Sequence, residues 1–195
     1  MTAPDDGLTL RAARAAYFAA NGLGDGGYDS PVVKLMAGPI PIYLPNTASR
    51  VRAVRFHDLH HVVTGYATTW SGEAEIGAWE IATGCADHVA AWILNLGAMA
   101  IGLVIAPAAT FRAFLRGRRT RNLYREPFGD PLLDETVGAV RRRLALEAAS
   151  PGVTARDALA FAAFALAAIA TLAAVLASVA GLLAAVAVSL ARLFG

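Results

Sequence analysis

The stretch RFHDLHHVVTGYATTWSGEAEIGAWE, residues 55–80, is the part of the sequence that is most informative about the fold. It carries the pattern H-D-x-x-H in His57, Asp58 and His61. Glu73 follows after a gap of eleven residues. On a helix with 3.6 residues per turn the first three side chains share one arc, and Glu73 belongs to the next helix. Imidazole and carboxylate groups together bind zinc, manganese or iron, so the pattern predicts an all-α fold with a metal site between two helices.

Two further side chains near this pattern are candidates for catalysis, Glu80 and Tyr66. Glu80 lies two helical turns after Glu73 on the same face, where it would support a metal-bound histidine or accept a proton. Tyr66 would donate a hydrogen bond to a bound molecule. An ion pair with an arginine for Glu80, and core packing for Tyr66, are the alternative interpretations.

His60 suggests a different kind of metal site. The series His57-x-x-His60-His61 is similar to the histidine box of membrane desaturases and hydroxylases, which use many more histidines to bind two irons. This chain has four histidines, so the di-iron site is excluded. On a helical wheel His60 lies about 100° from His61 and about 60° to the far side of His57. We therefore expect it in a supporting or surface position.

The residues around the pattern resemble the metal-binding segment of the coenzyme Q (ubiquinone) biosynthesis protein four family. A Thr-Gly-Tyr sequence follows the second histidine at residues 64–66, and Gly72 directly precedes Glu73, as is common in that family. The resemblance extends over residues 8–146 and is most specific around the motif itself.

The resemblance implies a function and a set of ligands. The divalent metal, with zinc as the first expectation and manganese or iron as alternatives, would be held by His57, Asp58, His61 and Glu73. The protein would be a metal-dependent oxidative decarboxylase, a lyase that removes the C1 carboxyl of a polyprenylated benzoate ring with coupled hydroxylation. Its partners would be the prenylated quinone precursor and other quinone biosynthesis enzymes, and we expect a homodimer. The alternatives are a non-catalytic prenyl-lipid-binding or scaffold protein with a structural metal, and a membrane protein acting on another prenyl lipid or quinone.

The composition places the chain at a membrane. Charged residues make up 16% of the chain, below the 25% or so of ordinary globular proteins. Residues 158–191 contain no charged side chain, and one membrane span needs only about 20 residues. We therefore expect a helical metal-binding domain at residues 1–150 and a transmembrane or membrane-associated tail at 151–195. A single long helix and a pair broken near Gly181 are both compatible with the tail, as is a buried helix.

A second apolar segment, residues 89–111, is also free of charge, and Pro107 is expected to kink or end it. The arginine-rich stretch 112–156 should be cytoplasmic by the positive-inside rule. If 89–111 crossed the membrane, the metal site would face outward, so we expect this segment inside the domain or on the membrane surface. The Ala- and Arg-rich composition suggests a bacterial protein. The expected location is the bacterial inner membrane, with the metal-binding domain on the cytoplasmic side.

Several familiar chemistries are missing from the sequence. It has no P-loop, no G-x-G-x-x-G after a strand, no G-x-S-x-G and no C-x-x-C pair. Cys85 is the only cysteine, which excludes a disulfide within one chain. Arginine clusters at 112–125 and 141–143 suit anionic lipid headgroups or a phosphate-bearing ligand. No nucleic-acid-binding motif accompanies them, so no nucleic acid partner is expected.

Local signals predict the elements around the motif. Ser49 and Ser71 are the expected N-caps of the two helices that carry it. One glycine and several prolines between residues 31 and 45 predict a short helix followed by extended, irregular chain. Helices are expected at residues 9–20, at 48–64, from 72 onward and at 134–149.

Overall fold

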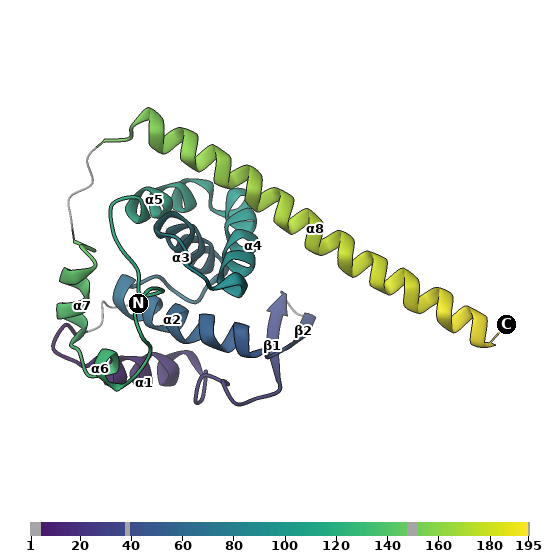
Figure 1. Cartoon of the computed structure of the whole chain (residues 1–195), viewed down its shortest axis with the longest axis horizontal. Helices are drawn as coiled ribbons and strands as arrows, with labels where there is room; N and C mark the ends of the chain where they lie inside the picture. Colours follow the sequence, from purple (N-terminus) through teal and green to yellow (C-terminus); the bar gives the residue numbers. More distant parts are fainter. Residues whose placement is uncertain (1–4, 38–39, 148–151, 195) are drawn as a thin grey trace.

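The computed structural model describes residues 5–37, 40–147 and 152–194, which form helices and one two-stranded sheet (Figure 1). The strands are β1 (Val32–Ala37) and β2 (Ile40–Pro45). The helices are α1 (Leu10–Asn21), α2 (Ala48–Thr64), α3 (Trp70–Thr83), α4 (Val89–Ile105), α5 (Pro107–Gly117), α6 (Asp130–Leu133), α7 (Val137–Arg143) and α8 (Ala155–Phe194). The predicted all-α class, with a long apolar helix at the C-terminus, is confirmed.

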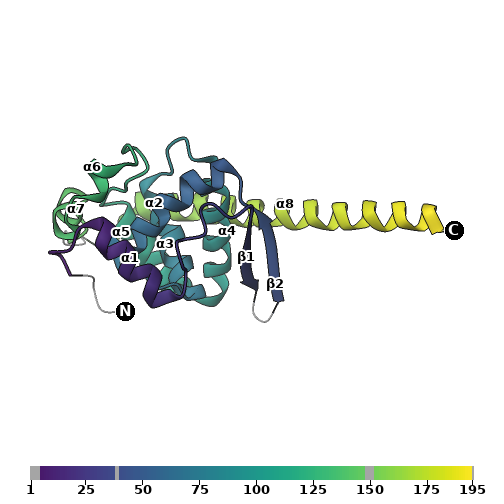
Figure 2. The ribbon, with the colours of Figure 1, turned by 90° about the horizontal axis from the view of Figure 1, so that it is seen from below.

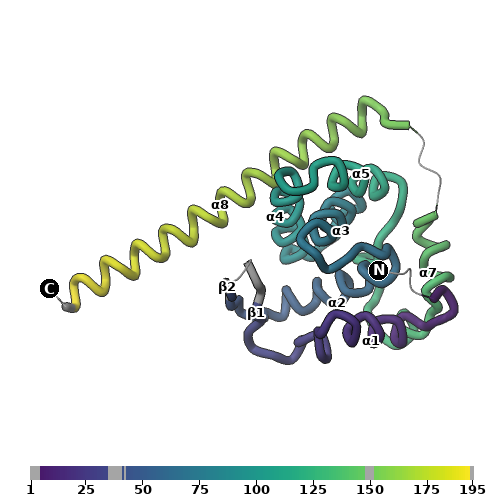
Figure 3. The backbone as a smooth tube through the Cα atoms, turned by 180° about the vertical axis from the view of Figure 1, so that it is seen from behind, coloured from purple at the N-terminus to yellow at the C-terminus, as the bar shows by residue number. Residues whose placement is uncertain are grey.

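Helix α3 forms the centre of the helical domain. It packs along α4 and α5, with α2 next to them (Figure 1 and Figure 3). Its residues Ile76, Ala78, Trp79 and Ile81 are almost completely buried and point to several sides of the helix. Apolar side chains on several sides of a helix are stable only inside a core. The core therefore fixes α3, and with it Glu73 in its first turn.

Threonine caps begin both helices of the motif. The Oγ1 atoms of Thr47 and Thr69 each accept a hydrogen bond, 3.2 Å long, from the backbone N–H three residues later. This satisfies a donor that the first helical turn would leave unpaired. The predicted caps Ser49 and Ser71 are wrong, because both lie inside the first turn of their helices. Gly65 ends α2 in the left-handed conformation, with a φ of 77°.

The connection between α2 and α3 is tight. A Cβ atom at Gly72 would overlap the carbonyl oxygen of Ala67, so only glycine lets the connecting loop close over the start of α3. Glu73 is the next residue and lies in the first turn of α3, where the helix dipole favours a carboxylate. This glycine thus helps to set the position of the glutamate relative to α2.

The interpretation of residues 31–45 as a short helix followed by irregular chain is wrong. β1 and β2 pair along their length as an antiparallel hairpin. Valine, isoleucine and tyrosine favour strands, and prolines are tolerated because both strands are edge strands. The side-chain amide of Asn46 closes the base of the hairpin by donating to three carbonyl oxygens, those of Gly27, Tyr28 and Ser30.

The helix expected at 134–149 is also corrected. Thr136 has an extended backbone and accepts a hydrogen bond from the N–H of Ala139, so α7 begins only at Val137. The helix ends at Arg143, and Ala145 has a positive φ of 58°. The last two predicted residues, 148 and 149, lie outside the described residues. A short separate helix, α6, precedes this region.

Pro107 divides the uncharged segment 89–111 between two helices. α4 ends at Ile105, Ala106 breaks the helical conformation with a φ of −150°, and Pro107 starts α5. Proline suits the first turn of a helix because its missing N–H would be unpaired there in any case. α4 packs against both α3 and α8 within the domain, and it buries Asn95 and Met99.

Helix α8 is continuous from Ala155 to Phe194, with no break at Gly181. Its first half packs on the domain through side chains such as Phe161 and Phe164, and its second half extends away from it (Figure 2). Forty residues at 1.5 Å each give a length of about 60 Å. By length and composition α8 can cross a membrane. The division of the chain at residues 150 and 151 stays a prediction.

Two glycines of α4 give a matched test of the packing. A Cβ at Gly102 would lie 2.6 Å from the Cβ of Ala74 on α3, whereas a Cβ at Gly97 meets nothing within 4 Å. We predict that Gly102→Ala lowers the free energy of unfolding by about 1–3 kcal/mol through overpacking. Gly97→Ala should raise it by up to about 1 kcal/mol, because alanine loses less entropy in a helix. Thermal unfolding in detergent, followed by circular dichroism, measures both. Equal stabilities would contradict this packing.

Candidate metal centre

Two imidazoles and one carboxylate converge between α2 and α3. The Nε2 atoms of His57 and His61 lie 3.1 Å apart. Glu73 Oε2 lies 3.3 Å from Nε2 of His57, and Glu73 Oε1 lies 3.3 Å from Nε2 of His61. His61 is buried, whereas His57 and Glu73 are partly exposed. The structure thus brings three of the four predicted ligands to one point with an open side.

The hydrogen-bond partner of each Nδ1 atom fixes the position of a proton on the imidazole ring. His57 Nδ1 lies 3.0 Å from the carboxylate oxygen Oε1 of Glu80. His61 Nδ1 lies 2.9 Å from the backbone carbonyl oxygen of Tyr66. Both partners only accept hydrogen bonds, so each Nδ1 carries a proton, and each Nε2 atom points toward the other and toward Glu73, where it can bind either a proton or a metal ion. Metal-binding histidines are usually oriented in this way.

The spacing of the three groups fits a divalent ion. Ligand atoms about 2.0–2.1 Å from a tetrahedral zinc ion lie roughly 3.3–3.4 Å apart. Here the two nitrogens lie 3.1 Å apart, and each lies 3.3 Å from a different oxygen of Glu73. Two imidazole nitrogens and a carboxylate this close together need a cation between them, either a proton or a metal ion. Two histidines and one carboxylate are also the ligand set of non-haem iron(II) sites.

The pKa values of His57 and Glu73 also indicate that this centre favours a positive charge. Burial lowers the pKa of His57, but Glu80 and Glu73 outweigh burial and raise this pKa well above its usual value. Burial raises the pKa of Glu73, but its hydrogen bonds with His57 and His61 outweigh burial and hold the pKa below its usual range. Without a metal ion the centre therefore takes up a proton. A metal ion and a proton would compete for the same point.

Glu80 is the buried support of this centre. Its Oε1 accepts from Nδ1 of His57 and, at 2.6 Å, from Nδ1 of His60. Its Oε2 accepts from the Tyr124 hydroxyl at 2.6 Å and from the side-chain amide of Asn95. Burial raises the pKa of Glu80, but the two imidazoles outweigh burial and hold the pKa well below its usual range. The structure thus places this predicted catalytic residue behind the ligands, as an ionised partner of His57.

Asp58, the fourth predicted ligand, lies beside the group of three. Its Oδ2 accepts a hydrogen bond, 2.5 Å long, from the hydroxyl of Tyr28. Burial raises the pKa of the Asp58 carboxyl, although Tyr28 and the nearby histidines oppose this rise. Its carboxylate is not part of the cluster formed by the other three side chains. Whether Asp58 binds the metal stays a prediction.

Tyr66, the other predicted catalytic residue, contacts the centre through its backbone. Its carbonyl oxygen orients His61, while its ring lies 5.3 Å from the guanidinium of Arg116. Burial raises the pKa of its hydroxyl. None of the hydrogen bonds found among the described residues brings this hydroxyl to the three ligands. A catalytic role for it stays a prediction.

Sequence reasoning gave a supporting position as one of two expectations for His60, and it missed two other supporting residues, Asn95 and Tyr124. His60 was expected in a supporting or surface position, and it is completely buried against Glu80. Its Nε2 accepts the backbone N–H of Leu123 at 3.0 Å, so it is a neutral ring, and burial lowers its pKa. The sequence did offer a hint for Asn95, because it is a polar amide in an otherwise apolar segment. Tyr124 lies in a loop, and no sequence pattern pointed to it.

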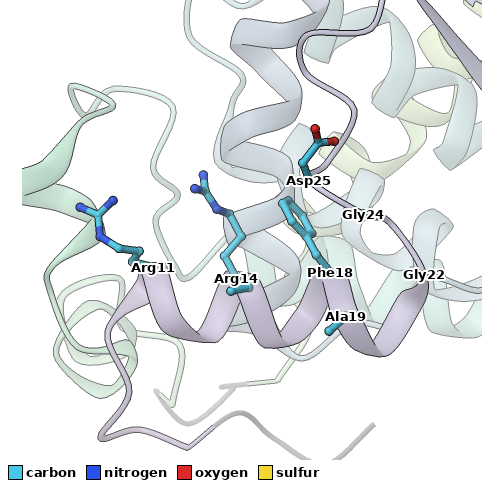
Figure 4. A pocket seen from close by; sticks show the side chains of 8 residues that line it. Arg11, Arg14, Phe18, Ala19, Gly22, Gly24 and Asp25 are labelled. Atoms are coloured by element: carbon cyan, nitrogen blue, oxygen red, sulfur yellow. The ribbon is translucent and has the colours of Figure 1, made fainter.

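A positively charged aromatic wall lies next to Asp58. The guanidinium carbons of Arg14 and Arg55 both lie within 6.0 Å of the ring centres of Tyr28 and Phe128. Among the described residues neither guanidinium forms an ion pair. Arg14 and Phe18 also project into an open pocket of about 520 Å³ beside α1 (Figure 4). We call the group formed by Arg14, Arg55, Tyr28 and Phe128 the arginine wall.

Comparison with protein-family models, with curated proteins and with solved structures gives no match for this chain. A function for this chain is therefore inferred from its own residues and from the geometry of the centre.

Two glutamates of α3 test how Glu80 supports the centre. Glu80→Gln removes the charge that polarises His57 and keeps the shape of the side chain. We predict that it weakens zinc binding by about 10–100-fold, the usual effect of losing such an outer partner. The half-exposed Glu75, which supports neither histidine, gives the control Glu75→Gln. Titration calorimetry with zinc measures both affinities. Equal affinities would show that Glu80 does not tune the ligands.

Proposed function

We propose that the chain binds one divalent metal ion through His57, His61 and Glu73 and acts in ubiquinone biosynthesis. The observation that carries the metal is the pair of Nε2 atoms of His57 and His61, which lie 3.1 Å apart and whose rings are oriented by Glu80 and by a backbone carbonyl. The resemblance of residues 55–80 to the coenzyme Q biosynthesis protein four family suggests the pathway. Zinc is the first expectation, and iron(II) or manganese also suits this set of ligands.

The number of ligands favours catalysis over a purely structural metal. Structural zinc sites are usually closed by four protein ligands, whereas catalytic sites keep one position for water or substrate. Here three ligands meet at a point that is partly open to solvent, and Asp58 is occupied by Tyr28. A divalent ion in such a site stabilises negative charge on a carboxylate or phenolate oxygen.

The arginine wall supports an acidic aromatic substrate. Arg14 and Arg55 offer guanidinium donors that suit a carboxylate, and Tyr28 and Phe128 offer aromatic faces for a ring. Tyr28 joins this wall to Asp58 of the motif. We propose that the carboxyl of a polyprenylated benzoate is recognised here. Replacing that carboxyl by a hydroxyl releases carbon dioxide and is a two-electron oxidation, so an oxidant such as dioxygen must take part.

The long apolar helix supports work at a membrane. A polyprenyl chain is insoluble in water, and a protein acting on it must reach the bilayer. α8 provides one helix that can cross a membrane. We propose the bacterial inner membrane with the metal centre on the cytoplasmic side, where the arginine-rich stretch 112–156 is favoured.

The second candidate function is a scaffold or prenyl-lipid-binding protein in which the metal is structural. The extensive contacts of Glu80 favour it, since they join His57 and His60 of α2 to α4 and to the loop that carries Tyr124. In that case loss of the metal would unfold the domain. In the enzyme, loss of Glu73 would stop turnover and leave the fold intact.

One genetic experiment separates these functions. Deleting the gene should make a prenylated hydroxybenzoate that still has its ring carboxyl accumulate, as mass spectrometry of lipid extracts would show. The wild type and Glu75→Gln should restore ubiquinone, and Glu73→Gln should fail while remaining folded. An unfolded Glu73→Gln protein would favour the scaffold. No accumulation of precursor in the deletion strain would contradict the ubiquinone assignment.

The arginine wall gives a prediction about the substrate. We expect the double variant Arg14→Gln/Arg55→Gln to bind a prenylated 4-hydroxybenzoate at least about tenfold more weakly, because charged hydrogen bonds are lost. The matched ligand is the same prenylated phenol without the carboxyl, whose affinity should not change. Fluorescence or calorimetric titration in detergent measures both ligands. An equal loss of affinity for both ligands would mean that the arginines do not recognise the carboxyl group.

A further inference from the structure

The hairpin of β1 and β2 has no extensive packing partner among the described helices. Its strands read VVKLMA and IPIYLP, with Lys34 as their only charged residue. Val32 is 44% exposed and Tyr43 is 62% exposed. A two-stranded hairpin standing alone in water is at best marginally stable. The exposed apolar side chains of Val32 and Tyr43, on a hairpin with little support, therefore call for a second surface to cover them.

The position of the hairpin indicates which surface this is. It lies at the end of the domain from which the free half of α8 extends, and its strands run crosswise to that helix (Figure 1 and Figure 2). Beyond Leu172, which still packs on the core, α8 is almost fully exposed. The 22 residues from 173 to 194 span about 33 Å, close to the 30 Å or so of a bilayer's hydrocarbon core. A bilayer around this half of α8 begins where the hairpin lies.

We propose that the hairpin lies on the membrane surface and forms a second membrane contact of this chain. Tyr43 and Lys34 are opposite each other in the register and are both exposed. An aromatic ring favours the headgroup level of a bilayer, and a lysine can reach anionic lipid headgroups from there. The contact rests on α8 crossing the bilayer, and it needs neither the metal nor the ubiquinone assignment.

Two contacts would fix the orientation of the domain, which a single helix does not. Only Asn46 and Thr47 separate β2 from α2, the helix that carries the metal motif. Asn46 also holds the backbone carbonyl of Tyr28, whose hydroxyl binds Asp58. The hairpin is thus joined by Asn46 and Tyr28 to Asp58, which lies beside the metal centre.

The test uses the full chain in vesicles of phosphatidylcholine and phosphatidylglycerol. The buried Cys85 is replaced by alanine, and single cysteines carry an environment-sensitive nitrobenzoxadiazole label. The hairpin position is Tyr43→Cys, and the membrane reference is Ala184→Cys in the exposed half of α8. The matched control is Arg142→Cys, an exposed site on α7 at the far end of the domain (Figure 1). Circular dichroism checks that every variant is folded.

We expect the labels at 43 and 184 to shift to shorter wavelength and to be quenched by lipids with a spin label near the headgroup or along the chain. The label at 142 should show neither change. Quenching at 184 without quenching at 43 would overturn the proposed contact. Quenching at neither position would overturn both the contact and the membrane span. Because no metal or substrate is present, either result is separate from a failure of the proposed enzyme activity.

Discussion

The buried carboxylate of Glu80 is the constraint on which the rest of the structure depends. An isolated charge in the interior costs several kcal/mol, so it is tolerated only where donors meet it from all sides. The donors come from distant parts of the chain: two imidazoles of α2, the amide of Asn95 on α4 and the hydroxyl of Tyr124 in a later loop. Packing α2, α3 and α4 correctly therefore also turns His57 toward Glu73.

The same arrangement explains why the centre is strongly supported from behind and open in front. On the buried side, carbonyl and carboxylate acceptors hold the protons of His57 and His61. On the other side lies Glu73, which is partly exposed, while Asp58, beside the three ligands, is joined to the arginine wall by the hydroxyl of Tyr28. A site built this way can exchange one partner, a water or a substrate oxygen, without disturbing its support.

Local patterns predicted the elements better than the contacts between them. The limits of α2 follow from its sequence, since residues 48–64 have helical character and Gly65 stops the helix. The hairpin was missed because the prolines and the single glycine of residues 31–45 interrupt its strand pattern. Three of the four predicted ligands meet, as helical spacing suggested. Asp58 lies outside this cluster and accepts a hydrogen bond from Tyr28, which lies in a distant loop. Partners of this kind, Tyr124 among them, depend on tertiary packing that spacing along one helix does not show.

X-ray absorption spectroscopy of the zinc-loaded protein tests the central claim most directly, because it reads the atoms around the metal. The account predicts an inner shell with two imidazole nitrogens at about 2.0–2.1 Å and a carboxylate oxygen. In His61→Asn the imidazole signal should fall to that of one ring. A shell made only of oxygen atoms, or a spectrum that His61→Asn leaves unchanged, would contradict a metal centre at His57, His61 and Glu73.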